Sequence, residues 1–318
     1  MKTPYISIII PTRNRLRDLR NCLKALTQQV TTDSYEVIIV DDHSHPEVLS
    51  KYKDLLRENA GMELRFLQLP PNQRGAVYAR NLGIKQAGGC LIGLLDDDCI
   101  PSANWVTTLC AYFVNNPTIT AITGRIAAVE LEHPLSAFRQ NFYNMRYERL
   151  LKGTTTESIR KRFALRPVEG LYLADYLAGG NSGIRQSALD DVEGFDTHFS
   201  SMHDKELAIR LLRRGHVCVF APDLVARHNH TKSVRDAMQK SFASGRSLYR
   251  LQTKHSGVLS DRVVNIFRPF QTIVRSLSFI GGLGWKSVLL VGSIMALEYC
   301  HQAGYVTELC RARFGYRS

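Results

Sequence analysis

Residues 91–98, Leu-Ile-Gly-Leu-Leu-Asp-Asp-Asp, place a continuously apolar run directly before three carboxylates. Similar short apolar runs recur along the N-terminal part of the chain, and longer amphipathic stretches separate them. Parallel strands covered on both faces are continuously apolar, and strands that alternate with helices are typical of βαβ units. We therefore expect an α/β fold with a mainly parallel central sheet flanked by helices. The expected strands are residues 6–10, 36–40, 64–68, 90–95 and 119–124, and the expected helices are residues 16–29, 46–59, 76–87 and 105–115.

The remainder of the chain divides into three further segments. Residues 126–170 are basic and aromatic without a clear strand period, which fits either a helical excursion or a mobile loop. A second ordered block extends from about residue 171 to residue 230, with a helix expected over 205–214 and a strand over 217–221. From residue 231 to about Thr253 the pattern is helical and amphipathic, and it begins a C-terminal helical extension.

The composition excludes several classes of protein. With 318 residues, 44% of them hydrophobic and 22% charged, the chain is neither disordered nor a polytopic membrane protein. Its formal charge of +12 is unevenly distributed: residues 1–138 have a net charge of zero and residues 167–227 of −3, whereas residues 139–166 carry +6 and residues 228–318 carry +9. The positive charge lies outside the acidic segments and no nucleic-acid motif accompanies it, so nucleic-acid binding is not supported. The seven cysteines contain no C-x-x-C pair, from which we expect a reducing compartment, no disulfides and no zinc site.

Carboxylates follow two of the expected strands at the point where each strand ends. Asp41 and Asp42 follow the second strand, and Asp96, Asp97 and Asp98 follow the fourth. Ligands of open α/β sheets bind beyond the carboxyl ends of the strands, so these five groups should share one edge. Like charges placed so closely repel unless a cation is bound, and Asp96 and Asp98 would face one side of an extended backbone. We expect Mg²⁺ or Mn²⁺ there, shared with substrate phosphates; the alternative is a polar turn that caps the next helix.

The common phosphate-binding motifs are absent from the sequence. No G-x-G-x-x-G follows the first strand and no G-x-x-x-x-G-K-[ST] occurs, so neither a dinucleotide cofactor nor a P-loop is supported. A metal-bridged diphosphate is the leading candidate ligand. Arg80 is a candidate cationic clamp on that diphosphate, and a solvated helix residue is the alternative interpretation.

Taken in order, these motifs resemble those of the family 2 glycosyltransferases, which have the GT-A nucleotide-sugar fold. Each segment is weak alone, but the ordered set over roughly residues 5–230 is specific. The matching segments are Ile8-Ile9-Ile10-Pro11-Thr12-Arg13-Asn14-Arg15, Val40-Asp41-Asp42-His43-Ser44, Gly75 with Ala79-Arg80-Asn81, Leu94-Leu95-Asp96-Asp97-Asp98 with Pro101, Ala178-Gly179-Gly180-Asn181-Ser182, Gly194-Phe195-Asp196, and Asp204-Lys205-Glu206-Leu207 with Arg210-Leu211.

The resemblance implies a domain organisation and a donor. Residues 1–230 would form the catalytic domain, with a nucleotide-binding half at 1–125 and an acceptor and catalytic half at 171–230. Residues 231–318 would form a basic, apolar helical extension. The donor would be a nucleoside-diphosphate sugar, and the cofactor a divalent metal, Mn²⁺ or Mg²⁺.

The resemblance also implies roles for single positions. The base and ribose of the nucleotide would be held by Pro11, Thr12, Arg13, Asp41 and Asp42. The family's Asp-x-Asp element would be Asp96, Asp97 and Asp98, with Asp96 near the ribose and the metal, Asp97 on the substrate and Asp98 on the metal. The donor-sugar and acceptor pocket would be shaped by Gly179, Gly180 and Asn181. His228 or His230 would lie near the metal or the diphosphate.

The mechanism implied by the resemblance is inverting and direct. Asp204 would take the proton from an acceptor hydroxyl, which attacks the anomeric carbon without a covalent enzyme intermediate. The family usually has Glu immediately before this Asp, and here His203 takes that place, where it would either lower the pKa of the base or replace a structural hydrogen bond. Ser201-x-x-Asp204 also fits a capping box, an alternative that does not exclude catalysis.

The C-terminal extension combines positive charge with apolar stretches. Lys286 is the only charged residue from Ser276 to Leu297, and Arg268 and Arg275 would fall near the same helical stripe, which is typical of a helix in a lipid headgroup plane. We expect peripheral attachment to the inner face of the cytoplasmic membrane and a cytoplasmic location. The acceptor would then be a sugar or a lipid-linked glycan of cell-surface polysaccharide or glycolipid synthesis. A helical hairpin packed on the catalytic domain, or an oligomer contact, is the alternative.

Two rival functions remain open from the sequence. A sugar nucleotidyltransferase uses a similar fold, but its chemistry asks for a Gly-rich phosphate loop where this chain has Pro11-Thr12-Arg13-Asn14. A non-catalytic nucleotide-sugar-fold subunit would not need the base Asp204 alongside Asp41 and Asp98.

Overall fold

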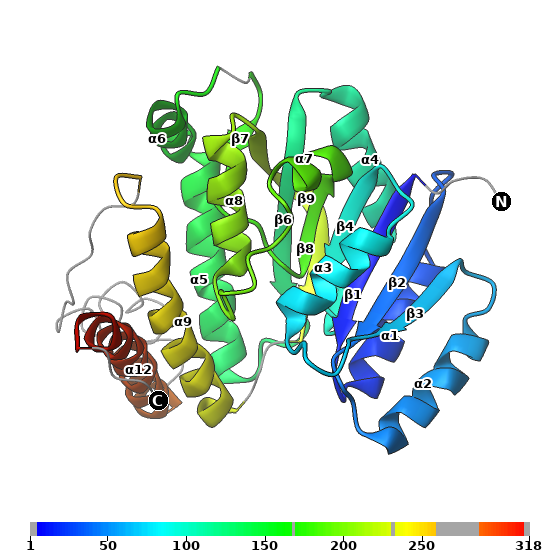
Figure 1. Cartoon of the computed structure of the whole chain (residues 1–318), viewed down its shortest axis with the longest axis horizontal. Coiled ribbons are helices and arrows are strands. Elements are labelled where there is room, and N and C mark those ends of the chain that lie inside the picture. Colours follow the sequence, from blue (N-terminus) through cyan, green and yellow to red (C-terminus); the bar gives the residue numbers. More distant parts are fainter. Residues whose placement is uncertain (1–4, 167–168, 230–232, 259–285, 315–318) are drawn as a thin grey trace. The chain divides into compact units, whose positions relative to one another are not determined.

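The computed structural model describes residues 5–166, 169–229, 233–258 and 286–314 (Figure 1). The chain divides into two compact units. The first comprises the described parts of Met1–Ala127, Met145–His198 and His203–Asn229, and the second those of Ala128–Asn144, Phe199–Met202 and His230–Ser318. Each unit is described by itself below.

A parallel group of four strands organises the first unit. In spatial order these are β3 (Leu64–Gln68), β2 (Tyr35–Asp41), β1 (Ile6–Thr12) and β4 (Leu91–Leu95), side by side in Figure 1. All residues of β1 are buried, as continuous apolarity predicts for a strand covered on both faces. The connecting helices are α1 (Leu16–Thr27), α2 (Pro46–Glu58), α3 (Ala76–Gln86) and α4 (Trp105–Asn115).

The sheet continues beyond β4 with antiparallel strands. β8 (Asn181–Arg185) pairs with β4, and β6 (Ile119–Ala128) pairs with β8, so the expected strand over 119–124 lies in the antiparallel part. β9 (Val217–His228) pairs with β5 (Cys99–Pro101) and β7 (Tyr172–Leu173), completing nine strands among the described residues. Two helices, α7 (Gln186–Asp191) and α8 (His203–Arg213), belong to this half. The expected α/β fold with a sheet flanked by helices is confirmed.

Two glycines set how closely helices approach the two faces of the parallel strands. A Cβ on Gly93 would lie 2.9 Å from the ring of Trp105 of α4, and one on Gly83 of α3 would lie 2.5 Å from Ile9. Ile8 lies beside Gly93 in the sheet and faces α4 with it. Because neighbouring residues of a strand point to opposite faces, Ile9 faces α3 on the other side of the sheet. The fully buried Trp105 ring nitrogen donates to Asn181 Oδ1 at 2.7 Å, which ties α4 to β8.

Most of the described residues between the end of β6 at Ala128 and residue 166 form helices, so of the two alternatives for this segment the structure shows the helical one. α5 (Pro134–Leu151) and α6 (Thr154–Phe163) are joined at Gly153, whose φ of +72° is a conformation that glycine adopts without steric cost.

In the second unit, the two helices described in the C-terminal extension pack against each other. α9 (Val234–Lys254) and α12 (Lys286–Phe314) approach so closely that a Cβ on Gly245 would meet the His301 backbone, and one on Gly304 the Phe242 backbone. Glu308 of α12 accepts from Arg246 at 2.9 Å and from Arg250 at 2.7 Å. Burial opposes ionisation of Glu308, but these arginines hold its pKa below the ordinary value. Arg268, Arg275 and residues 276–285 of the apolar stretch lie outside the described residues, and no described helix is long and apolar enough to cross a membrane.

A buried ion pair supports the second half of the first unit. Glu206 is fully buried and accepts from Arg210 Nε through both carboxylate oxygens at 2.9 Å, while the same guanidinium donates to Gly194 O at 2.7 Å. We predict that Arg210→Met lowers the free energy of unfolding by about 3–5 kcal/mol, because the carboxylate of Glu206 would stay buried without the guanidinium of Arg210. Urea denaturation followed by circular dichroism measures this loss.

The control is Arg57→Met, which removes an exposed ion pair with Asp54. It should change the free energy of unfolding by less than about 1 kcal/mol. Equal losses in the two variants would contradict a structural role for the buried pair.

Candidate active site

The carboxyl ends of β1, β2 and β4 meet at one edge of the sheet, as the sequence predicted. Thr12 lies beside Asp41 in the register of β1 and β2. The Thr12 hydroxyl donates to Asp97 Oδ2 at 2.8 Å, which joins the loop after β1 to the loop after β4. Arg13 lies 3.8 Å from Asp42, and Pro11 is a buried residue of β1. The polar residues of the three loops therefore form one continuous surface.

The last residue of β2, Asp41, and the first residue after it, Asp42, are buried carboxylates, and each has one oxygen without a hydrogen-bond partner among the described residues. Asp41 is fully buried and accepts from Ser44 N at 3.1 Å through Oδ2. Its Oδ1 and the Oδ1 of Asp42 are buried and have no hydrogen-bond partner among the described residues. Buried acceptors are normally satisfied, so these two oxygens indicate a ligand that brings N–H or O–H donors.

Asn14 and His43 hold the loop after β2 in shape. Both adopt left-handed backbone conformations, each with a φ of 56°. Asn14 donates its backbone N–H to Ser44 Oγ at 2.7 Å and accepts from His45 N at 2.7 Å. The ends of β1 and β2 are thus tied to each other independently of any ligand.

The three aspartates after β4 lie in a turn, closed by a hydrogen bond from Cys99 N to Asp96 O at 3.0 Å. The alternation expected for an extended backbone therefore does not apply here, because the turn gives each aspartate a different partner. Asp96 pairs with Arg80, Asp97 with Thr12 and Arg15, and Asp98 with Arg15 and His228.

Burial and charge shift the pKa values of two of these carboxyls in opposite directions. Burial raises the pKa of Asp97 to about 7, although Arg15 acts against the shift. Burial also opposes ionisation of Asp98, but His228 and Arg15 bring the pKa of Asp98 down to about 2. Asp98 is therefore ionised throughout the physiological pH range, and it is a stronger candidate than Asp97 for binding a cation.

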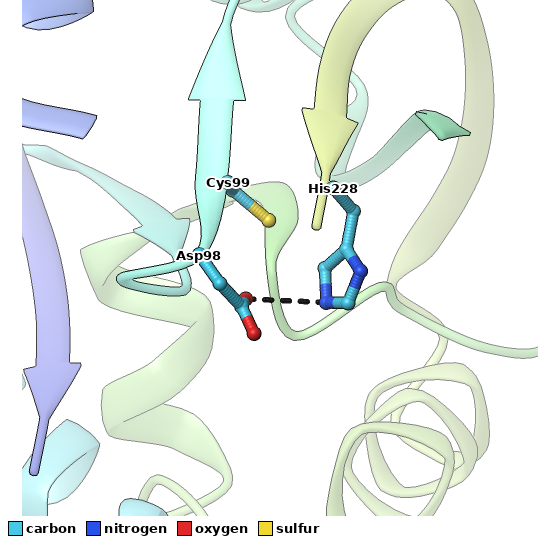
Figure 2. Close-up of side chains that lie close together, drawn as sticks. All are labelled: Asp98, Cys99 and His228. Atoms are coloured by element: carbon cyan, nitrogen blue, oxygen red, sulfur yellow. Dashed lines mark ion pairs between the residues drawn. The ribbon is translucent and has the colours of Figure 1, made fainter. Parts of the chain in front are cut away.

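Asp98 and His228 form a pair of donors suited to a metal ion (Figure 2). His228 Nε2 lies 3.1 Å from Asp98 Oδ1, and ligand atoms of Asp98, Cys99 and His228 all lie within 4.8 Å of one another. The antiparallel pairing of β5 with β9 places His228 opposite Cys99. A carboxylate suits Mn²⁺ or Mg²⁺ and an imidazole suits transition metals, so of these two cations the pair favours Mn²⁺; burial raises the pKa of the Cys99 thiol well above its usual value and disfavours a thiolate ligand. His230 lies outside the described residues.

Arg15 is a site residue to which the sequence analysis gave no role. Its Nη1 lies 3.0 Å from Asp97 Oδ1 and 2.5 Å from Asp98 Oδ2, and its side chain is 41% exposed. It supplies part of the positive charge that the acidic edge requires. The sequence offered one signal for it, since it is the basic residue that ends the first matching motif.

Arg80 is not a solvated helix residue, because its side chain is only 3% exposed. The guanidinium donates to Asp96 Oδ1 at 2.6 Å and to Gly179 O at 3.3 Å, and Nη1 lies 2.6 Å from His203 Nε2. Asp96 remains 32% exposed, so it is the member of this group that faces outward.

Gly179 and Gly180 allow their segment to lie directly against the charged groups. A Cβ on Gly179 would be 2.9 Å from Arg80 Nη2, and one on Gly180 would be 2.8 Å from Asp96 Oδ2. Asn181 follows in β8, fully buried, and its side-chain amide donates to the carbonyls of Arg125 and Leu224.

Asp204 lies beside this segment in the first turn of α8. Its Oδ2 accepts from Gly179 N at 3.4 Å, and its Oδ1 accepts from Lys205 N at 3.0 Å. A carboxylate in the first turn also complements the helix dipole, so a structural role and a role as a base are compatible.

Comparisons with known proteins identify the family to which the chain belongs. Residues 7–193 match Glycosyl transferase family 2. Glycosyltransferase AglE of Haloferax volcanii is 26% identical over 245 residues, which cover 76% of this chain and 72% of that protein. The pre-mycofactocin glycosyltransferase of Mycobacterium tuberculosis is 27% identical over 261 residues, which cover 82% of this chain but 50% of that protein.

A solved structure shares the fold at low sequence identity. The mannosyltransferase PcManGT of Pyrobaculum calidifontis, solved in complex with GDP-Man and Mn²⁺, superposes with a TM-score of 0.63 at 17% identity and covers 97% of this chain and 88% of its own. The match of one family to more than half of the chain, together with this fold, shows that the chain belongs to glycosyl transferase family 2.

Proposed function

We propose that this glycosyltransferase moves a sugar from a nucleoside-diphosphate sugar to an acceptor hydroxyl with inversion and with the help of a divalent cation. The observation that carries the proposal is one connected network at the carboxyl edge. Arg80 joins the outward-facing Asp96 to Gly179, and Gly179 N donates to Asp204. Donor-side and acceptor-side carboxylates are thereby held in one arrangement.

The nucleotide is assigned to the loops after β1 and β2. The unused oxygens of Asp41 and Asp42 are acceptors for the donor groups of a base and a ribose. Pro11, Thr12 and Arg13 border the same loop and complete the binding surface. Asp97 supports it through its hydrogen bond with Thr12.

Asp98 and His228 are the residues assigned to the cation, with Asp96 near the ribose. A bound Mn²⁺ or Mg²⁺ would neutralise the charge that develops on the departing diphosphate. PcManGT was solved with Mn²⁺, which supports the same choice here. Arg15 pairs with both Asp97 and Asp98, so it would compete with the cation for Asp98.

Asp204 is assigned as the base. It takes the proton of the acceptor hydroxyl, the hydroxyl oxygen forms a bond to the anomeric carbon, and the bond from that carbon to the diphosphate breaks with its electron pair leaving on the nucleotide. A single displacement of this kind inverts the anomeric centre. The family match favours this reaction over a nucleotidyltransferase or a non-catalytic subunit.

The acceptor is proposed to be a sugar or lipid-linked glycan at the inner face of the cytoplasmic membrane. Residues 228–318 carry a net charge of +9. On α12, Tyr299 and Val306 lie seven residues apart and are 49% and 38% exposed, which gives one face of that helix an apolar surface. A net positive charge in the same segment as an exposed apolar helix face favours an anionic lipid surface.

Substitutions at the cation site should change metal binding in opposite directions. Asp98→Asn should weaken Mn²⁺ binding at least about tenfold, because it removes the ionised ligand and costs at least about 1.4 kcal/mol. Arg15→Met should tighten it about two- to fivefold, since the partly exposed ion pair that competes with the metal contributes less than about 1 kcal/mol. Isothermal titration with MnCl₂, with and without GDP or UDP, measures both effects.

The control for the cation site is Asp54→Asn on the exposed surface of α2, which should leave Mn²⁺ affinity unchanged. An Asp98→Asn protein with wild-type affinity would exclude Asp98 as a metal ligand.

Removal of the base should separate binding from transfer. Asp204→Asn should keep GDP or UDP affinity within about threefold and lower the turnover of nucleotide-sugar by about 10²–10⁴, the usual contribution of a general base. Release of GDP from GDP-mannose and of UDP from UDP-sugars, measured with Mn²⁺, gives the rate. Full turnover by this variant would refute the assignment of Asp204.

The membrane contact should depend on both lipid charge and α12. The full chain should sediment with phosphatidylcholine vesicles that contain phosphatidylglycerol and should remain unbound with vesicles of phosphatidylcholine alone. The double substitution Tyr299→Ser with Val306→Ser should weaken vesicle binding about tenfold, because partial burial of the two side chains in lipid contributes about 1.4 kcal/mol. Val114→Ser, at an exposed position of α4, is the control. Equal sedimentation with both vesicle types would contradict an electrostatic lipid contact.

A further inference from the structure

One of the two terminal guanidinium nitrogens of Arg80 makes a contact that has no role in the reaction proposed above. Nη1 lies 2.6 Å from Nε2 of His203, the residue immediately before the proposed base. Nη2 holds Asp96 and Gly179. Each terminal nitrogen of Arg80 therefore has its own partner, and His203 is the partner on the side of α8.

The chemistry of the two groups fixes the state of the imidazole. Arginine has N–H donors only and stays charged, so Nε2 of His203 must be the acceptor and the ring proton must be on Nδ1. His203 Nδ1 is buried without a hydrogen-bond partner among the described residues. Burial, and then the neighbouring Arg80, lower the pKa of His203 to about 4, which is consistent with a neutral ring.

Packing holds the ring and the guanidinium in this geometry. The Phe195 ring meets His203 edge-on, with centroids 5.7 Å apart, and the Arg80 guanidinium carbon lies 5.7 Å from the centroid of the same ring. Asn81, the neighbour of Arg80, fixes Phe195 by bonding both its N–H and its carbonyl, at 2.9 and 2.8 Å. His203 is thus held on a rigid surface that also supports Arg80.

A neutral acceptor has one consequence that a carboxylate at position 203 would not have. It orients Arg80 without sharing its positive charge, so that charge remains directed at Asp96, 2.6 Å away. Asp96 and the Gly179 segment are the two groups that link the donor side to Asp204. Movement of Arg80 would release both of them.

We propose that His203 is a positioning residue for sugar transfer, which accepts a hydrogen bond from Arg80 and thereby keeps Asp96 and the Gly179 segment in place beside Asp204. This inference rests on the proposed function, because it assigns His203 a part in the same transfer.

Two amide substitutions test the acceptor role without adding a charge or an apolar group. The amide oxygen of His203→Gln reaches the place of Nε2, whereas the shorter side chain of His203→Asn does not. We expect His203→Asn to lower the turnover number for GDP release from GDP-mannose, or UDP release from UDP-sugars, about tenfold or more, the loss typical of a hydrogen bond to a charged group. His203→Gln should stay within about threefold of wild type, a difference of less than about 1 kcal/mol.

Two controls separate positioning from folding. Thermal melting of both variants reports stability, and the exposed His198→Gln should match wild type in every assay. In an Arg80→Met background, His203→Asn should cause no further loss, because the two residues act through one contact. In addition, ¹⁵N spectra of histidine-labelled full chain should show His203 with a proton on Nδ1 and none on Nε2 at neutral pH.

The outcomes are distinguishable. Wild-type turnover in His203→Asn, equal losses in the Asn and Gln variants, or a proton on Nε2 of His203 would each overturn the positioning role while leaving the proposed transfer intact. A wild-type chain that releases no nucleotide from any of these donors would instead overturn the proposed function, and this inference with it.

Discussion

Repulsion among carboxylates at one edge of the sheet is the constraint on which the rest of the site depends. Parallel pairing of β1, β2 and β4 brings Asp41, Asp42 and the 96–98 turn to the same edge. Such a cluster is stable only with nearby positive charge. Arginines from separate elements supply that charge: Arg13 and Arg15 after β1, and Arg80 from α3. The position of each arginine then determines which carboxylate is left to meet a ligand.

Asp96 and Asp98 are paired with positive charge in different ways. Asp96 is paired with a buried arginine that has three protein partners, so its geometry is fixed before any donor arrives. Asp98 is paired with the partly exposed Arg15 and with His228, so its partners are exchangeable. A fixed carboxylate suits orientation of the ribose, and an exchangeable one suits a metal that enters and leaves with the nucleotide. This division follows from the burial of the two arginines, since the side chain of Arg80 is 3% exposed and that of Arg15 is 41% exposed.

Local patterns in the sequence were sufficient for much of the fold, but not for the contacts of the site. Apolar runs and turn residues predicted the bounds of the four parallel strands and their helices within one or two residues, because both patterns depend only on residues that are close together in the sequence. They did not predict β5 and β7, which are too short to show a period. The aspartate edge was predicted because strand order implies it. The burial of Arg80 and its contact with His203 were not, because those residues lie 123 positions apart and only the packed structure joins them.

Diffraction from crystals grown with Mn²⁺ and GDP or UDP, with anomalous scattering used to locate the metal, tests the central claim most directly. We predict a manganese peak bound by Asp98 and His228, with Arg15 displaced from Asp98 and the nucleotide on Asp41 and Asp42. A nucleotide bound elsewhere on the chain, or a manganese peak that touches neither Asp98 nor His228, would contradict it.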